Sequence, residues 1–176
     1  MLNLKKGAQD IVETLKSNGF QAYLVGGCVR DLLLAKEPAE WDITTSARPE
    51  QVSKLFEKVI PTGIEYGTVT IFLSDGKYEV TTFRRDESYV DGRHPANVIF
   101  TDDIHQDLAR RDFTINALAY DPESDQLIDD FNGQKDLEKK LIRAVGDPEK
   151  RFEEDALRMM RAVRLATELN FEIENE

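Results

Sequence analysis

Two acidic residues one position apart, Glu40 and Asp42, flank a tryptophan in the first quarter of the chain. Side chains alternate between the faces of a strand, so both carboxylates should project to one side while Trp41 points into the core. Neighbouring carboxylates repel, and Mg²⁺ binds such oxygen ligands together with substrate phosphates. The pair therefore predicts a magnesium site for nucleotide chemistry. The plainer interpretation is two solvated acids at the entrance of a strand.

A third acid, Glu79, lies inside the β-prone run YEVTTF at 78–83. It is flanked by Tyr78 and Val80, so it occupies the opposite face of a strand from these two apolar residues. Glu79 is a candidate third catalytic carboxylate facing the same metals. It is equally compatible with a residue on the solvated face of a sheet.

A double glycine, Gly26-Gly27, separates the apolar run at 22–25 from a helical pattern at 29–34. Backbone N–H groups at a helix start attract anions, and glycine lets a phosphate come close. Arg30, one turn into the helix, would add a charged fork to the same phosphate. These residues predict a nucleotide-binding turn, with a simple strand-to-helix turn as the alternative.

A basic segment, Arg110-Arg111-Asp112 with Asn116 following, adds a second nucleotide-binding candidate. Adjacent arginines suit triphosphate oxygens. Asp112 or Asn116 would hold a ribose hydroxyl. The structural alternative is an ion-paired helix end.

Four charged residues recur at intervals of three near the end of the chain: Asp155, Arg158, Arg161 and Arg164. This spacing keeps successive side chains close on a helix, although the row drifts slowly around it. A carboxylate can accept from the exocyclic amine of a base, and an arginine can donate to a ring nitrogen or a carbonyl. The row predicts an edge that recognises a base. The alternative is a solvent face in which Asp155 pairs with Arg158.

Periodicity and turn signals define the elements that must position these residues. Helices are expected at 5–18, 29–34, 49–56 and 134–141, and a long final helix from Asp147-Pro148 to 169. Strands are expected at 22–25, 41–45, 68–73 and 78–83, with a short strand and turn at 127–133 and a loop at 84–97. Residues 109–120 mix both signals. The order predicts an α+β fold with a small mixed sheet flanked by helices.

Composition places the chain among compact proteins of the cytoplasm. With 176 residues, 40% of them hydrophobic, it can form one domain or a domain and part of another. It has no signal-peptide pattern and no apolar run of the ~20 residues that cross a membrane. Its only cysteine, Cys28, is expected to be a small buried side chain, although a helix start could lower its pKa. His94 and His105 are expected at the surface without zinc. The net charge of −11 alone opposes a nucleic-acid partner.

Several segments together resemble the class II tRNA nucleotidyltransferases, the family of CCA-adding enzymes and bacterial poly(A) polymerases. The matching segments, in family order, are LVGGCVRDLLL, WDITTSA, YEVTTFR, DLARRDFTINALA, DDFNGQKDLEKKLIRAVGDPEKRF and EDALRMMRAVR. The resemblance implies a polymerase-β-like nucleotidyltransferase head at 1–143 and the truncated start of a helical neck at 144–176. The chain is expected to be a piece of a longer protein.

The resemblance also implies roles for individual residues. Gly27 and Arg30 match the nucleotide-binding turn, and Arg111 matches a triphosphate contact. The row Asp155, Arg158, Arg161 and Arg164 matches neck residues that read and hold CTP or ATP. Glu40 and Asp42 match the metal pair, but the family normally has Asp at the first position. The extra methylene of Glu40 predicts an adapted strand, a slow site, or a deliberately disabled one.

The implied activity is template-independent addition of C and A to tRNA 3′ ends by two-metal phosphoryl transfer with Mg²⁺. Alternatives are an A-adding or poly(A)-adding relative, or an impaired nucleotide-binding module because of Glu40. The length of the loop at 84–97 favours addition of CCA or A. The acidic chain alone should bind tRNA poorly and be weakly active or inactive, because the RNA-holding body and tail regions of the family are absent from it.

Overall fold

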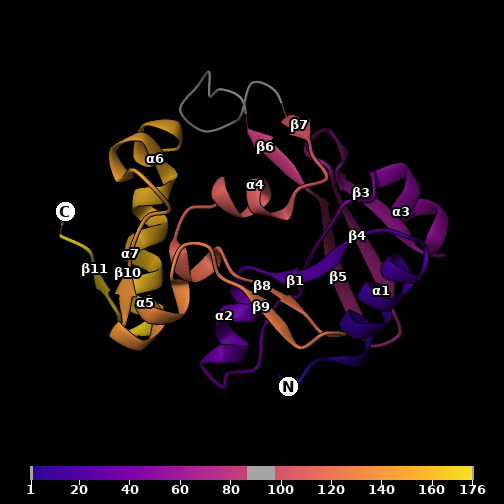
Figure 1. The fold of residues 1–176 in the computed structure, drawn as a ribbon, viewed down its shortest axis with the longest axis horizontal. Helices are drawn as coiled ribbons and strands as arrows, with labels where there is room; N and C mark the ends of the chain where they lie inside the picture. Colours follow the sequence, from indigo (N-terminus) through magenta and orange to yellow (C-terminus); the bar gives the residue numbers. More distant parts are fainter. Residues whose placement is uncertain (1, 87–97, 176) are drawn as a thin grey trace.

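The computed structural model describes residues 2–86 and 98–175 and contains a seven-stranded mixed sheet with helices packed against it (Figure 1). The order of its strands is β3-β4-β5-β2-β1-β8-β9. These strands are β1 (Ala22–Val25), β2 (Asp42–Thr45), β3 (Val59–Gly63), β4 (Thr68–Leu73), β5 (Gly76–Thr82), β8 (Ala119–Asp121) and β9 (Gln126–Ile128). The α+β class with a helix-flanked sheet is confirmed.

One parallel pair, β2 with β5, lies at the centre of a sheet whose other neighbours are antiparallel. Ile43 of β2 and Val80 of β5 are register partners and lie in the main core. Because side chains alternate along a strand, the residues before and after them face the opposite side of the sheet. The central pair therefore presents one apolar face and one polar face.

The apolar face is covered by α1 (Lys6–Ser17) and α3 (Pro49–Leu55), which lie side by side at the indigo and purple end of the chain (Figure 1). Helix α1 is amphipathic and buries Ala8, Ile11, Val12 and Leu15 at helical spacing. Its first turn is held from outside the helix, because Asp75 in the β4–β5 turn accepts a hydrogen bond from the backbone of Gly7 at 3.0 Å.

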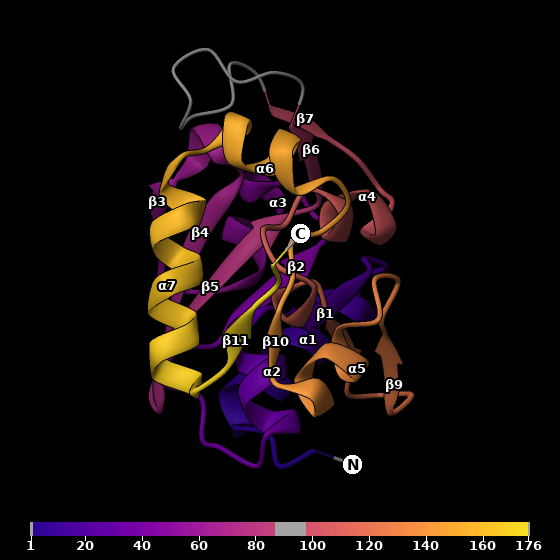
Figure 2. The ribbon, with the colours of Figure 1, turned by 90° about the vertical axis from the view of Figure 1, so that its left-hand side faces the viewer.

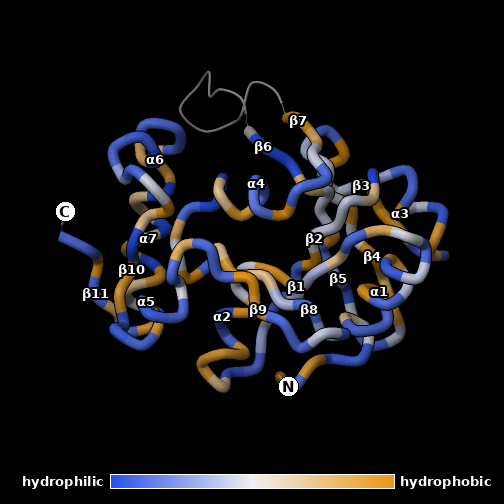
Figure 3. Tube along the Cα trace, viewed as in Figure 1, coloured by the Kyte–Doolittle hydropathy of each residue, from blue (hydrophilic) through white to orange (hydrophobic). Residues whose placement is uncertain are grey.

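The polar face carries α4 (Ile104–Ala109). A second, smaller apolar cluster seats α4 on this side, formed by Val25, Phe83, Ile104, Leu108 and Ala119. Helix α2 (Gly27–Leu33) and the 3-10 turn η2 (Thr114–Asn116) contact each other and place Cys28, Val29 and Ile115 in the main apolar core. The short hairpin β6 (Arg84–Asp86) with β7 (Val98–Phe100) projects beside α4, and β6 is strongly hydrophilic (Figure 3). The second 3-10 turn is η1 (Ile64–Tyr66).

The C-terminal segment packs alongside the sheet as α5 (Gly133–Lys139), β10 (Leu141–Ile142), α6 (Pro148–Glu154), α7 (Leu157–Leu169) and β11 (Glu172–Ile173) (Figure 2). Strands β10 and β11 pair in parallel. Ala162 and Leu165 of α7 belong to the main apolar core. The helix that carries the arginine row is therefore fixed against the sheet domain. Within the described ranges, no helix is long and apolar enough to cross a membrane.

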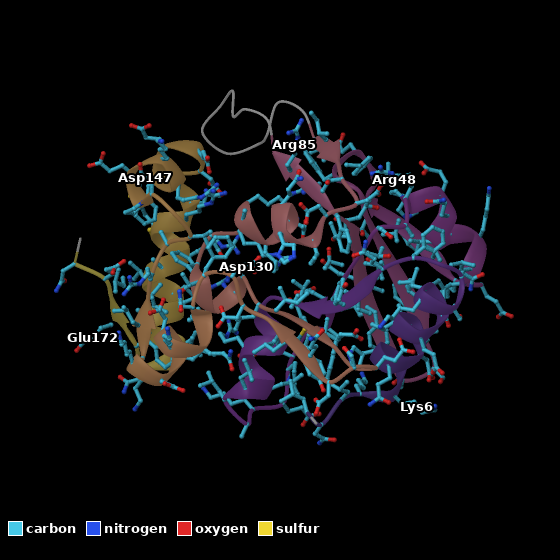
Figure 4. All side chains as sticks on the ribbon, in the orientation of Figure 1. Lys6, Arg48, Arg85, Asp130, Asp147 and Glu172 are labelled. Carbon is cyan, nitrogen blue, oxygen red and sulfur yellow. The ribbon has the colours of Figure 1, made fainter. Side chains whose placement is uncertain are left out.

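The prediction of one long helix from 147 to 169 is wrong, because the helix is interrupted at Asp155. Asp147 caps α6 by accepting from the backbone of Glu149, and it is labelled in Figure 4. Asp155 has extended backbone angles, and its Oδ1 accepts from the backbone N of Leu157 at 2.9 Å. Aspartate competes with the helix for backbone hydrogen bonds and so favours a helix start over a helix interior.

Other elements begin or end at residues different from those expected. The loop assigned to 84–97 is wrong at its start, because residues 84–86 form β6; the remainder lies outside the described residues. Helix α2 begins at Gly27, two residues early, and β2 begins at Asp42. The helices and strands expected at 5–18, 22–25, 49–56, 68–73 and 78–83 are confirmed within two residues.

Candidate active site

The centre of the candidate site is a pair of carboxylates on neighbouring strands. Asp42 of β2 is the register partner of Glu79 of β5. The residues that follow them, Ile43 and Val80, are buried on the side of α1 and α3, so both acids project from the opposite face. Parallel pairing of distant segments thus brings together two of the three acids expected to act jointly.

A cavity of about 200 Å³ adjoins this pair and is lined by residues of both charges. Asp42 and Glu79 supply its acidic part, and Arg84, Arg110 and Arg111 supply its basic part. The remaining lining residues are Val25, Ile43, Thr68 and Thr81. Carboxylates beside several guanidinium groups are what a metal-bound polyphosphate requires.

The pKa of Asp42 reflects its burial and the charged residues around it. Burial raises the pKa of Asp42, Arg111 lowers it, and the charges of Glu79 and Glu40 raise it again, to about 6. A bound cation would stabilise the ionised carboxylates and so relieve this repulsion. Within the described ranges, no cluster of three or more His, Cys, Asp or Glu has the geometry of a complete metal site. Mg²⁺ needs only one or two protein carboxylates beside substrate phosphates, so the residues present fit it.

Glu40 lies outside the strand that was expected to carry it. It is exposed in the bend before β2, whereas Trp41 is buried as predicted. Strand alternation therefore does not set the direction of its side chain, and the expectation that Glu40 and Asp42 project to one side stays a prediction. Glu40 lines a second cavity of about 350 Å³, together with Glu79. The negative charge of Glu40 makes a small contribution to the raised pKa of Asp42.

The glycine turn lies directly beside the carboxylates. Gly26 has a φ of 77°, which favours glycine, and an added Cβ would stand 3.1 Å from Nη1 of Arg111 and 4.0 Å from Oδ2 of Asp42. Gly27 lies against the guanidinium of Arg30. The turn thus lies beside Asp42 and Arg111 at Gly26 and beside Arg30 at Gly27, and its role in binding a phosphate stays a prediction.

The segment of residues 110–116 is divided between two positions. Arg110 and Arg111 line the cavity, whereas Asp112 is buried, with 6% of its surface exposed. Oδ1 of Asp112 accepts from its neighbour's backbone and from Nδ2 of Asn116 at 3.3 Å, and Oδ2 lies 2.7 Å from Nη2 of Arg161. Oδ1 of Asn116 in turn accepts from Nη1 of Arg30 at 2.8 Å. Asp112 and Asn116 therefore link the arginine row to the glycine turn.

The charged row on α7 follows the slow drift expected of it. Arg158 is buried; its Nη1 donates to Oε2 of Glu154 at 2.7 Å and its Nη2 reaches the carbonyl of Arg110 at 3.4 Å. Arg161 is half exposed and pairs with Asp112. Arg164 is exposed beside Glu168 at 3.8 Å. The structure brings Arg158 and Arg161 to the head and leaves Arg164 at the surface.

Two acids in this region escaped the sequence analysis. Asp107 is completely buried beneath the arginines of the cavity, and Glu154 joins Arg151 to Arg158. Asp107 precedes Arg110 and Arg111 by three and four residues, and Glu154 precedes Arg158 by four. These are the helical spacings at which charged side chains pair, so the signal was present in the sequence.

The cysteine and the described histidine have structural surroundings. Cys28 is buried as expected, but burial raises its pKa to about 11, so a reactive thiolate is excluded. His105 is exposed as expected, and Nδ1 stands 2.6 Å from Oδ2 of Asp130, which is labelled in Figure 4. His94 lies outside the described residues.

A fold that places two acids on neighbouring strands, beside a glycine turn and a group of cavity-lining arginines, defines a nucleotidyltransferase head. The chain belongs to the family described as the Poly A polymerase head domain, which it matches over residues 22–143. The resemblance read from the motifs is therefore confirmed.

Individual relatives narrow the comparison. The chain is 55% identical over 169 residues to a CCA-adding enzyme of Lactobacillus helveticus, covering 96% of this chain and 42% of that protein. The crystal structure of the Bacillus stearothermophilus CCA-adding enzyme in complex with CTP superposes with a TM-score of 0.88 and 45% identity, over 98% of this chain and 42% of that one. A tRNA nucleotidyltransferase complexed with a primer tRNA and an incoming ATP analog gives a TM-score of 0.75 and 35% identity, over 94% and 46%. The chain thus spans less than half the length of these relatives.

Proposed function

We propose that the chain is the nucleotide-transfer part of an enzyme that adds C and A to tRNA 3′ ends from CTP and ATP. The observation that carries the proposal is the cavity in which Asp42 and Glu79 meet Arg84, Arg110 and Arg111. The names of the relatives and their complexes with CTP, an ATP analog and primer tRNA support the same reaction. Such a substrate suits a cytoplasmic protein.

In this proposal Glu40 and Asp42 hold Mg²⁺, with Glu79 as the third catalytic carboxylate. The metal chemistry supplied at these acids is activation of the RNA 3′-hydroxyl and neutralisation of charge on the leaving pyrophosphate. The 3′-oxygen attacks the α-phosphorus, and the bond to pyrophosphate breaks. Gly26, Gly27 and the cavity arginines keep the triphosphate in line, because positioning and charge neutralisation supply most of the catalysis in phosphoryl transfer.

In this proposal, residues 1–143 form the head and residues 144–176 form the start of a neck. The C-terminal helices of the neck recognise the base of the nucleotide. Asp155 would accept from the amine of C or A, and Arg158 would donate to the ring. Arg161, Arg164, Asp112 and Asn116 complete the proposed nucleotide site with Arg30. Asp112 acts through Arg161 and Asn116 in this proposal, because its own oxygens are buried and engaged.

A chimera tests the reaction in a complete protein. Residues 1–176 replace the matching part of the B. stearothermophilus CCA-adding enzyme, and the product receives Mg²⁺, each NTP separately, and tRNA lacking its 3′ end. We expect incorporation of C and then A, with U and G rejected. Incorporation of A alone or of long A tracts would support an A-adding or poly(A)-adding relative. CTP binding without extension of any RNA would support a nucleotide-binding module.

A further inference from the structure

A single buried acid contacts every arginine that lines the cavity beside Asp42 and Glu79. Asp107 of α4 is 0% exposed. Its Oδ1 accepts from Nε and Nη2 of Arg110 at 3.0 and 2.8 Å and lies 3.3 Å from the backbone N of Arg84. Its Oδ2 accepts from Nη2 of Arg111 at 3.1 Å. The arginines that line the cavity are therefore arranged around a single carboxylate, that of Asp107.

The same carboxylate is tied to the strands that carry the candidate metal ligands. Oγ1 of Thr44 lies 3.2 Å from Oδ2 of Asp107 and 3.2 Å from the carbonyl oxygen of Thr81. Thr44 stands two residues after Asp42 on β2, and Thr81 stands two residues after Glu79 on β5. All four project from one face of the sheet. Asp107 thus connects the acidic and basic parts of the cavity.

Electrostatics explain why the carboxylate of Asp107 stays ionised although it is fully buried. Burial alone would raise the pKa of Asp107, but the guanidinium groups of Arg110 and Arg111 hold it below its usual range, so the carboxylate stays charged. Without it, two adjacent, partly buried guanidinium groups would repel each other.

Some N–H groups of Arg111 do not donate a hydrogen bond to Asp107. Nη1 of Arg111 is directed to the glycine turn, since it would lie 3.1 Å from a Cβ on Gly26. Nε of Arg111 is buried and has no hydrogen-bond partner among the residues that the structure describes. Buried donors of this kind are normally satisfied, so a ligand oxygen is expected at this place.

We propose that Asp107 is the positioning residue of the cavity: it fixes Arg110 and Arg111 relative to Asp42 and Glu79, and thereby makes the site selective for a nucleoside triphosphate over a monophosphate. The inference rests on the proposed function, which supplies the nucleotide. Asp107 itself touches no substrate, because it is fully covered by the arginines that do. Its effect should therefore follow the number of phosphates on the ligand.

The test compares CTP with CMP binding to the 176-residue chain in Mg²⁺, by titration calorimetry, for wild type and Asp107→Asn. The wild type should prefer CTP. In Asp107→Asn we expect CTP affinity to fall roughly 10- to 100-fold, the effect of an ~1 Å misplacement of a charged group. CMP affinity should be unchanged, a pattern that a general loss of packing would not produce. Asp121→Asn is the matched control, because it breaks an ion pair with Lys16 at the far edge of the sheet.

The outcomes separate the two proposals. A wild type that does not prefer CTP contradicts the proposed function. A wild type that prefers CTP while Asp107→Asn keeps that preference, or loses CTP and CMP affinity equally, overturns the role of Asp107. If Asp107→Asn does not fold, Thr44→Val replaces it, since it keeps the buried charge and removes one hydrogen bond to it. A several-fold loss for CTP alone then supports the inference, and equal or absent losses refute it.

Discussion

Glu40 is the residue at which the chain departs from the aspartate pair expected of its family. Its exposed place in the bend before β2 gives it more freedom than a strand residue has. Its charge nevertheless acts on Asp42, so the side chain belongs to the acidic cluster. In the proposed site, the longer side chain of Glu40 would have to reach the metal from this bend and not from a strand.

Glu40→Asp should raise single-turnover incorporation of CMP in the chimera, by up to roughly 100-fold, because Mg²⁺ tolerates little geometric slack. Rapid-quench measurement with saturating CTP gives the rate. Glu50→Asp on the exposed surface of α3 provides the control for the same chemical change. An unchanged or slower rate would show that the bend has adapted to glutamate.

Asp42 should lower the stability of the folded chain wherever it is ionised. Its folded pKa of about 6 lies above the ordinary value of 3.8, so the native state binds more protons between these pH values and stability falls as pH rises. Asp42→Asn removes this penalty, which is at most about 3 kcal/mol. We expect the variant to unfold at a higher temperature at pH 8 in EDTA and to show no such gain near pH 3.5. A gain of equal size at both pH values would contradict the electrostatic origin.

At the scale of elements, α1 depends on a side chain from the β4–β5 turn. Oδ2 of Asp75 accepts from the backbone of Gly7 and from the hydroxyl of Tyr78 at 2.8 Å, and these hydrogen bonds outweigh burial and lower its pKa. The helix start has no cap from its own Lys5. The hairpin turn thus performs the capping that local sequence omits.

Asp75→Ala should reduce the free energy of unfolding by about 1 kcal/mol, the usual effect of losing a helix cap. Urea denaturation at pH 7 measures it, with Asp10→Ala as a control because, among the residues that the structure describes, the carboxylate of Asp10 forms an ion pair only with the exposed Lys6. The folded pKa is lowered, so the contribution is present at neutral pH and is lost as pH falls through the acidic range. Equal effects of the two substitutions would exclude the capping role.

Individual strands and helices show how much of the fold local sequence patterns can predict. Apolar and β-prone runs correctly predicted β1, β2, β4 and β5, but the sequence left open whether Glu79 shares a face with Asp42, which the pairing of β2 with β5 decides. Helix α4 has six residues, too few to show a helical period, and β3 contains Pro61 and Gly63, which are typical of turns. The carboxylate of Asp107 contacts residues from two other elements, Thr44 of β2 and Arg84 of β6, so its importance became visible only in three dimensions.

At the scale of the whole molecule, the net charge sets the affinity for RNA that we expect of this chain. The net charge is −11, and the arginines near the site are largely engaged by Asp107, Asp112 and Glu154. Phosphate contacts supply most of the affinity for nucleic acid and require uncompensated cations. We expect filter binding at 150 mM salt to give a tRNA affinity at least tenfold weaker than that of the B. stearothermophilus CCA-adding enzyme. Comparable affinities would contradict this expectation.

The proposed site draws on segments from Gly26 to Arg161, and the central pairing of β2 with β5 joins strands separated by a whole hairpin. These groups come together only when the distant segments that carry them have packed. A nucleotide should therefore bind only the complete fold and, at 100 times its dissociation constant, stabilise it by about 2.7 kcal/mol. During synthesis, a ribosome-bound chain would stay unable to capture CTP until helix α7 had emerged and docked.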